Sequence, residues 1–247
     1  MKAYIIIIFC LSADYIVEAQ EAVVDQPTEW FAITSTSKLS KYVNVYADVH
    51  LRYVKGFEPM MFQYRIAPEW VVSKTISIAP IGFVYIQNFI YGDQPAPIAN
   101  NERRFYQQII VKHNSGKFVF NHRFRVEERI IQSHQGLSDE GFIVHQTRLR
   151  YRAMVNYPFN RSKIEAGTFF GSFYDEIFVS WGDKVTFHSP DQNRIYLGLG
   201  YQFSQQVTLQ TGFFFQALLK SNGTKQENNI GLMTQFTYNF DFTKKEN

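Results

Sequence analysis

Arginines occupy every second position in two stretches of the chain, and this spacing could serve to bind or conduct anions. The residues in the two rows are Arg123, Arg125, Glu127, Arg129, Arg148, Arg150 and Arg152. A guanidinium group stays charged at physiological pH and can hold both oxygens of a carboxylate or phosphate. Rings of basic side chains select anions in channels. The rows therefore predict an anion-selective passage or binding site, or a lumen closed by arginines paired with carboxylates.

The residues between the arginines are mostly apolar or aromatic, which identifies the elements that must carry them. The intervening residues are Phe118, Phe120, His122, Phe124 and Val126 in the first stretch, and Leu149, Tyr151, Ala153 and Val155 in the second. Successive side chains of a β-strand point to opposite faces, whereas a helix would spread the arginines around its circumference. Residues 117–131 and 142–157 are therefore predicted to be consecutive antiparallel strands, each with one charged and one apolar face.

Two architectures can hold such strands. In a soluble sandwich, the apolar face meets a second sheet and the charged face meets water. In a membrane barrel, the apolar face meets lipid and the charged face lines the lumen. Aromatic residues make up 17% of the chain. No apolar run after the N-terminal segment reaches the roughly 18 residues of a spanning helix. We therefore predict an all-β fold, an antiparallel transmembrane β-barrel.

The C-terminal residues 230–242 also favour a barrel, because apolar or threonine side chains at every second position up to Phe242 alternate with Gly231, Met233 and then polar residues. If this were an edge strand facing water, its aromatic face would be an aggregation hazard. A last strand with a phenylalanine near the chain end resembles the recognition signal of outer-membrane barrels. Phe240 and Phe242 are therefore predicted to form a C-terminal assembly signal.

Residues 1–19 have the pattern of a cleaved signal peptide, with a basic start, a short apolar run and Ala19 before the expected cut. The alternative is an N-terminal membrane anchor, but the run is about half of the roughly 20 residues that a spanning helix needs. Cys10, the only cysteine, lies in this segment. Residues 20–247 are then expected to be one barrel domain without a thiol or disulfide.

Eleven strand-like segments can be counted, although bacterial single-chain barrels have even strand numbers. We therefore predict ten to twelve strands. If there are ten strands, residues 29–36 start outside the wall or lie in the lumen. If there are twelve, one strand is not detectable in the sequence. Residues 20–28 look irregular. The long connections are expected near 55–59, 93–100, 132–140, 177–190 and 219–227, and the short ones near 37–40, 73, 114–116, 158–161 and 204–206.

The six histidines give no support to an enzyme. A lipid hydrolase needs a serine or acidic residue that a histidine positions at the lipid-facing surface. His122 is predicted to point outward, but its outward neighbours are Phe120 and Phe124. His134 and His188 lie in predicted loops without a spaced partner, so no metal site is expected. No phosphate loop or nucleophile elbow occurs, and we expect no cofactor. A net charge of +3 is too small to indicate nucleic acid.

The lumen is predicted to carry a ladder of charged side chains. Its members are Arg52, Arg65, Glu102, Arg104, Arg123, Arg125, Glu127, Arg129, Arg148, Arg150, Arg152 and Arg194. Side chains can fill the interior of a narrow barrel. Glu127 is expected to point inward and pair with an arginine of its own or a neighbouring strand. Glu128 is expected at the membrane rim.

Several short motifs occur together along the chain. They are Trp30, Leu39-Ser40-Lys41, Arg52, Glu102-Arg103-Arg104, residues 123–129 (RFRVEER), residues 148–152 (RLRYR) and residues 191–201 (DQNRIYLGLGY). With them the chain resembles an uncharacterised outer-membrane β-barrel family, a domain of unknown function common in Bacteroidetes-type bacteria, over nearly all of residues 20–247. The resemblance implies a barrel in the outer membrane of a Gram-negative bacterium, and it implies no activity.

We therefore expect an outer-membrane barrel with an Arg/Glu-lined, largely plugged lumen, acting as a structural or accessory subunit of an envelope assembly. The alternative is a small anion or solute channel, and a lipid-modifying enzyme fits less well. Expected partners are outer-membrane lipids, the barrel assembly machinery during insertion, and other envelope proteins. Nucleic acid is not an expected partner.

Overall fold

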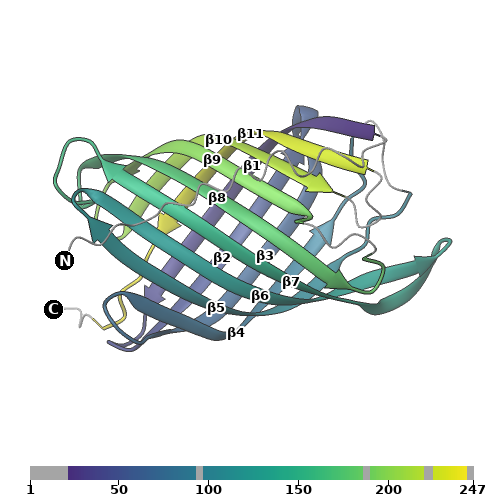
Figure 1. Cartoon of the computed structure of the whole chain (residues 1–247), viewed down its shortest axis with the longest axis horizontal. Helices are drawn as coiled ribbons and strands as arrows, with labels where there is room; N and C mark the ends of the chain where they lie inside the picture. Colours follow the sequence, from purple (N-terminus) through teal and green to yellow (C-terminus); the bar gives the residue numbers. More distant parts are fainter. Residues whose placement is uncertain (1–21, 93–96, 186–189, 220–224, 244–247) are drawn as a thin grey trace.

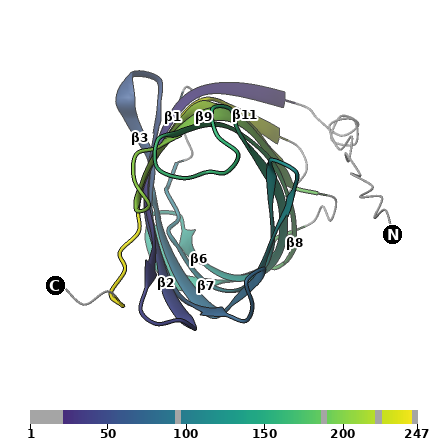
Figure 2. The same ribbon diagram turned by 90° about the vertical axis from the view of Figure 1, so that its left-hand side faces the viewer.

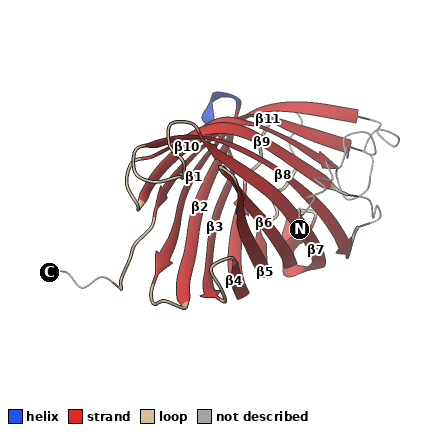
Figure 3. Ribbon diagram, turned by 60° about the vertical axis from the view of Figure 1, so that its left-hand side comes forward, coloured by secondary structure: helices blue, strands red, loops and turns tan. Residues whose placement is uncertain are grey.

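The computed structural model describes residues 22–92, 97–185, 190–219 and 225–243. Eleven strands in these ranges form a closed barrel, seen from the side in Figure 1 and towards one end in Figure 2. The strands are β1 (Ala22–Lys38), β2 (Val43–Val54), β3 (Glu58–Val71), β4 (Ile76–Asn88), β5 (Glu102–Ser115), β6 (Phe118–Gln135), β7 (Ser138–Pro158), β8 (Thr168–Gly182), β9 (Gln192–Gln202), β10 (Val207–Leu219) and β11 (Lys225–Tyr238). A short 3₁₀ turn, η2 (Lys55–Phe57), joins β2 to β3 and is blue in Figure 3. Within the described ranges, no helix has the length and apolar character of a membrane span.

The barrel is mixed rather than wholly antiparallel. Strands that follow one another in sequence pair antiparallel, but β1 closes the barrel by pairing parallel with β11, where Thr34 lies opposite Thr237. An odd number of strands requires this, because reversing direction at each step leaves the first and last strands pointing the same way. The expected antiparallel arrangement is therefore wrong at this seam, while eleven strands lie within the predicted range.

The N-terminal segment is part of the barrel wall. Residues 29–36, expected outside the wall or in the lumen of a ten-stranded barrel, belong to β1. Residues 22–28, expected to be irregular, are paired as well, since Ala22 lies opposite Lys225 and Thr28 opposite Gly231. Local alternation could not show this, because the partner strand lies 203 positions away in the sequence.

The connection expected near 132–140 is instead a continuation of two strands. β6 runs to Gln135, β7 begins at Ser138, and only Gly136 and Leu137 lie between them. Gly136 adopts a φ of 60°, which a glycine in a two-residue hairpin turn takes without steric cost. In Figure 1 this β6–β7 hairpin extends beyond the rest of the barrel.

Two further boundaries differ from the sequence prediction. β8 continues to Gly182, because Phe178 and Ser180 maintain the inward alternation beyond residue 176. The turn expected at 158–161 is a longer connection, residues 159–167. Asn160 holds it together, since its side-chain amide donates to the Gly167 carbonyl and its Oδ1 accepts from the Phe169 N–H.

Some predicted features fall wholly or partly outside the described residues. These are the signal peptide at 1–19, the connections near 93–100, 177–190 and 219–227, and His188.

Inward and outward side chains alternate around the barrel. In β6, Arg125 and Glu127 are 1% and 0% exposed, whereas Phe124 and Val126 are 47% and 39% exposed. Each of the eleven strands carries at least one exposed large apolar side chain. The charged row therefore faces the lumen, and the outer wall is apolar.

Aromatic and aliphatic side chains fill part of the lumen. One buried cluster consists of Trp30, Tyr174, Tyr196, Phe214 and Met233, and a second consists of Ala67, Ala79, Val84, Ile86 and Tyr106. The Tyr106 ring lies against the backbone of Gly82, where an added Cβ would come within 2.2 Å of the ring. Glycine at this position leaves room for the ring to lie flat against the wall.

Candidate functional site: the charged lumen

Arginines lie directly opposite one another on neighbouring strands. Arg104 on β5 is the register partner of Arg129 on β6, and Arg125 on β6 is the partner of Arg150 on β7. Like charges in directly opposed positions of a sheet repel each other. In both pairs one glutamate accepts hydrogen bonds from the two arginines, and this bridging offsets the repulsion.

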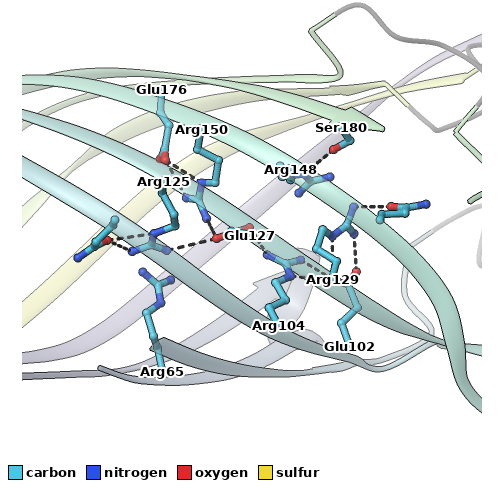
Figure 4. A network of polar contacts seen from close by, with 12 residues as sticks. Arg65, Glu102, Arg104, Arg125, Glu127, Arg129, Arg148, Arg150, Glu176 and Ser180 are labelled. Atoms are coloured by element: carbon cyan, nitrogen blue, oxygen red, sulfur yellow. Dashed lines mark hydrogen bonds and ion pairs between the residues drawn. The ribbon is translucent and has the colours of Figure 1, made fainter. Parts of the chain in front are cut away.

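Glu127 is the most enclosed of these bridges. Its Oε1 accepts from Arg150 Nη1 at 2.6 Å and from Arg125 Nη1 at 3.3 Å, and its Oε2 accepts from Arg104 Nη1 at 3.4 Å. Figure 4 shows the three guanidinium groups converging on this carboxylate. The predicted inward pairing of Glu127 is thus present. Glu128 is exposed on the other face, where it accepts a hydrogen bond from Thr147 Oγ1.

Glu102 bridges the other opposed pair. Its Oε2 accepts from Arg104 Nη2 at 2.6 Å and from Arg104 Nε at 2.8 Å, while its Oε1 accepts from Arg129 Nη2 at 2.7 Å. Arg129 also donates from Nη1 to Gln146 Oε1 at 2.7 Å. Such two-pronged, charge-assisted contacts hold planar groups in a fixed orientation.

Glu176 extends the network to β8 and β9. Its Oε1 accepts from Arg123 Nη2 at 2.5 Å and from Arg150 Nη2 at 2.8 Å. Arg194 Nη1 lies 3.8 Å from Glu176 Oε2. Since Arg150 contacts both Glu127 and Glu176, one continuous set of polar contacts joins β5, β6, β7, β8 and β9. We call this set the lumen network.

Two further ion pairs lie beside the lumen network. Arg65 Nη1 is 3.6 Å from Asp48 Oδ2, and Arg148 Nη2 is 3.2 Å from Asp191 Oδ2. Arg148 also donates from Nε to Ser180 Oγ at 2.7 Å. These contacts account for two more of the buried guanidinium groups.

Aromatic rings lie beneath several of the arginines. The guanidinium carbon is 4.1 Å from the ring centre of Tyr106 for Arg125, and 4.5 Å from that of Phe178 for Arg150. The negative face of an aromatic ring attracts such a cation, by roughly 2 kcal/mol or more when water is excluded. The rings therefore add to the stabilisation that the carboxylates give these two charges.

Arg52 and Arg152 differ from the other lumen arginines. In the described part of the chain neither forms an ion pair. The Nε of each has no hydrogen-bond partner, a feature shared by Arg65, Arg123 and Arg194. Arg152 is the register partner of Arg123 on the neighbouring strand. Of these two arginines, Glu176 contacts only Arg123. Arg52 instead lies over the indole ring of Trp30, at 3.9 Å.

A cavity of about 510 Å³ lies beside the lumen network. It extends from Tyr91 and Asn100, on the connection between β4 and β5, to Thr34 and Gln235 on β1 and β11. An eight-stranded barrel has an interior that side chains just fill, whereas 16 to 18 strands leave an aqueous channel. This lumen is intermediate, with one part occupied by charged side chains and one part open.

All twelve predicted ladder residues point into the lumen. Ten of them are buried, while Arg152 and Arg194 are half-buried. Ten line the cavity, and the other two, Arg125 and Glu127, lie behind them. The structure thus brings together residues from six different strands, β2, β3, β5, β6, β7 and β9.

Three carboxylates of the site were absent from the predicted ladder: Asp48, Glu176 and Asp191. Asp48 lies four residues before Arg52 and so shares its face of β2, which was a usable signal. Glu176 was missed because the strand was expected to end there. Asp191 precedes β9, and strand alternation does not define which way such a residue points.

The predicted C-terminal signal residues lie just beyond β11. The Lys38 N–H donates to the Phe240 carbonyl, and the Phe242 N–H donates to the Lys38 carbonyl. Phe240 and Phe242 are 49% and 64% exposed, with their rings stacked 5.7 Å apart. They continue the contact between the two ends of the barrel wall.

The predicted outward position of His122 is observed. Its Nδ1 lies 2.9 Å from the Tyr151 hydroxyl, and its ring stacks on His113 with centres 5.4 Å apart. Within the described ranges, no group of three or more His, Cys, Asp or Glu side chains is arranged to hold a metal ion.

Comparison of the chain with known proteins identifies a family, but the description of that family names no activity. No curated protein and no solved structure matches the chain significantly. Residues 28–228, which include every ladder residue, match the family described as "Protein of unknown function (DUF2490)". This chain therefore belongs to the DUF2490 family, and its structure is a closed, mixed barrel of eleven strands.

Proposed function

We propose that this chain is an outer-membrane β-barrel with a largely filled lumen, and that it serves as a structural or accessory subunit of an envelope assembly. The observation that carries the proposal is the complete burial of Glu127 among Arg104, Arg125 and Arg150. Contacts of this kind fix neighbouring strands to one another from the inside. A wall held in this way suits a rigid scaffold.

The outer surface supports the location. Exposed apolar side chains such as Phe124, Leu149 and Leu197 occupy the outward positions of the strands. Exposed apolar area of this extent marks contact with lipid or with other proteins. A closed barrel also leaves no unpaired strand edge, which is a condition for crossing the hydrocarbon region of a bilayer.

Among the described residues, the β6–β7 hairpin is the part of the barrel best placed to contact a partner. It projects past the other strands, and Leu137 at its tip is 91% exposed. Its base is braced by two hydrogen bonds of Ser133, one to Glu140 and one from Lys184. An exposed apolar tip on a braced support is suited to docking.

Cell fractionation and gel migration test the location. The folded chain is expected in the outer-membrane fraction, and heating is expected to change its migration in a detergent gel. Recovery as a soluble periplasmic protein would contradict the proposal. A photo-crosslinking residue in place of Leu137 is expected to capture an envelope protein. The matched control places the crosslinking residue at Leu39, an exposed leucine in the β1–β2 connection. This variant is expected to capture no envelope protein.

A second candidate function is a small anion or solute channel, and the cavity lining favours it. Nine arginines contribute to that lining, against three carboxylates, Asp48, Glu102 and Glu176. Recordings in planar bilayers separate the two functions. A scaffold gives no steady current, whereas a channel gives single-channel steps with a reversal potential that follows the chloride gradient.

A further inference from the structure

The cavity in the lumen has the size of a site for a small organic molecule. Its volume of about 510 Å³ falls within the roughly 300–1,000 Å³ of typical ligand pockets. Its lining combines charged groups with large apolar ones, including Trp30, Tyr174, Phe178 and Met233. Pockets of this composition hold an apolar body while a few charged groups fix its orientation.

The charge of the lining is unbalanced. Nine arginines and three carboxylates line the cavity. Glu127 and Asp191 bond lining arginines from outside it. Even with these two and the buried Glu227, which accepts hydrogen bonds from the lining residues Tyr91 and Asn229, the arginines exceed the carboxylates by three. Buried charge without a counter-charge is unfavourable, so an anion in the cavity would stabilise the barrel.

Arg52 is the strongest single indication of a ligand. Its side chain is more than nine-tenths buried, lines the cavity, and forms no ion pair with any described residue. The indole of Trp30 supports one face of its guanidinium group, at 3.9 Å. A guanidinium placed over a ring still presents a fork of N–H donors that matches the two oxygens of an oxyanion.

Arg194 lies over the same indole as Arg52. Its guanidinium carbon is 4.8 Å from the ring centre of Trp30, and its Nε has no hydrogen-bond partner. The contact from Arg194 to Glu176, at 3.8 Å, is long for an ion pair. Two cations therefore share one aromatic ring, and of the two only Arg194 lies near a carboxylate.

We propose that the lumen cavity binds a small organic anion. Its oxyanion head, a phosphate monoester or a carboxylate, lies between Arg52 and Arg194. Its flat apolar body lies along Tyr174 and Phe178. This goes beyond the structural role, and it requires only the folded barrel, so it can be tested independently of the cellular location.

Trp30 provides a direct reporter. The chain has three tryptophans, and Trp70 and Trp181 are 48% and 43% exposed on the outer wall, whereas Trp30 is 1% exposed in the lumen. Replacing both outer ones (Trp70→Phe, Trp181→Phe) leaves only the lumen fluorophore. The folded barrel in detergent is then titrated with phenyl phosphate, benzoate, inorganic phosphate and benzyl alcohol.

Phenyl phosphate or benzoate is expected to change Trp30 fluorescence in a saturable way, and whichever binds more tightly identifies the class of head group. Inorganic phosphate is expected to bind at least tenfold more weakly, because it lacks the apolar body. Benzyl alcohol, which is neutral, is expected to give no saturable change. An equal response to benzyl alcohol and phenyl phosphate would overturn the proposal.

Variants of Arg52 complete the test. Arg52→Gln is expected to weaken phenyl phosphate binding at least tenfold, and Arg52→Lys, which retains the charge without the fork, is expected to weaken it less. Arg103→Gln is the matched control, because Arg103 is exposed on the outer wall over Phe142. Heat-dependent gel migration verifies that each variant is folded. Unchanged binding by folded Arg52→Gln would refute the assignment.

Discussion

Arg150 donates from Nη1 to Glu127 Oε1 at 2.6 Å, and this bond joins β7 to β6 across the most enclosed part of the lumen. The same Oε1 accepts from Arg125, whose register partner is Arg150. Glu127 therefore holds together two cations that would otherwise repel each other. The consequence is an unusual dependence of the barrel on one carboxylate.

Replacing that carboxylate should be far more harmful than replacing its neighbour. Glu127→Ala leaves three guanidinium groups without their shared acceptor, and breaking a buried ion pair costs roughly 3–5 kcal/mol. Glu128→Ala removes an exposed side chain bonded to Thr147, and exposed polar contacts contribute about 1 kcal/mol or less. The temperature at which gel migration changes should fall clearly for Glu127→Ala only. Equal, small effects would indicate a wide, water-filled lumen.

The parallel seam can be tested by crosslinking. The Thr34 and Thr237 hydroxyls are 2.8 Å apart, so cysteines at both positions should form a disulfide under oxidation. The experiment uses a Cys10→Ser background to leave no other thiol. Thr211 and Thr234, 3.0 Å apart between β10 and β11, provide a positive control that any barrel topology permits. A disulfide between positions 211 and 234 without one between positions 34 and 237 would point to a ten-stranded barrel without β1.

The end of the chain should be needed for insertion. Deleting residues 238–247 removes the backbone bonds between Lys38 and the segment after β11, and Phe242→Asp places a charge in the predicted assembly signal. Both changes should abolish recovery in the outer membrane. Phe159→Asp, which alters an exposed phenylalanine in the β7–β8 connection, should insert normally. Normal insertion of the truncated chain would show that Phe242 contributes only local packing.

The contact between Gly82 and Tyr106 predicts a rescue. In Gly82→Ala the new methyl group would collide with the Tyr106 ring, and overpacking of this kind costs roughly 1–3 kcal/mol. Tyr106→Leu should itself destabilise the barrel, but it should make Gly82→Ala nearly neutral when the two are combined. Thermal unfolding of the four proteins in the cycle measures this coupling. Additive effects would exclude steric contact as the cause.

The sequence alone was sufficient to predict the faces of the two arginine-bearing strands, β6 and β7, and the inward position of the arginines. A period of two residues fixes which side chains share a face, and this held from Arg52 to Arg194. It was not sufficient for the seam, because the pairing of β1 depends on a strand 203 positions away. The hairpin at Gly136 was missed because polar residues on both sides resemble a loop.

The acceptor side of the site was harder to predict than the donor side. Glu176 was overlooked because its strand was expected to end at that residue. The sequence marks Trp30 only as part of a motif. Its contact with Arg52 depends on the register between β1 and β2, which the sequence does not define. The cavity could not be predicted either, because it is the volume that remains after side chains from many strands have packed.

The parallel pairing of β1 with β11 also constrains the order of events during folding. β1 and its partner are the first and last strands of the barrel, so the donors and acceptors along one edge of residues 22–34 stay unpaired until the barrel closes. Contacts over such separations form slowly, because a long loop must close first. An unpaired edge can meanwhile add a strand from another molecule. We therefore expect the folding stage before β1 pairs with β11 to be the one at which a chaperone best protects this chain from aggregation.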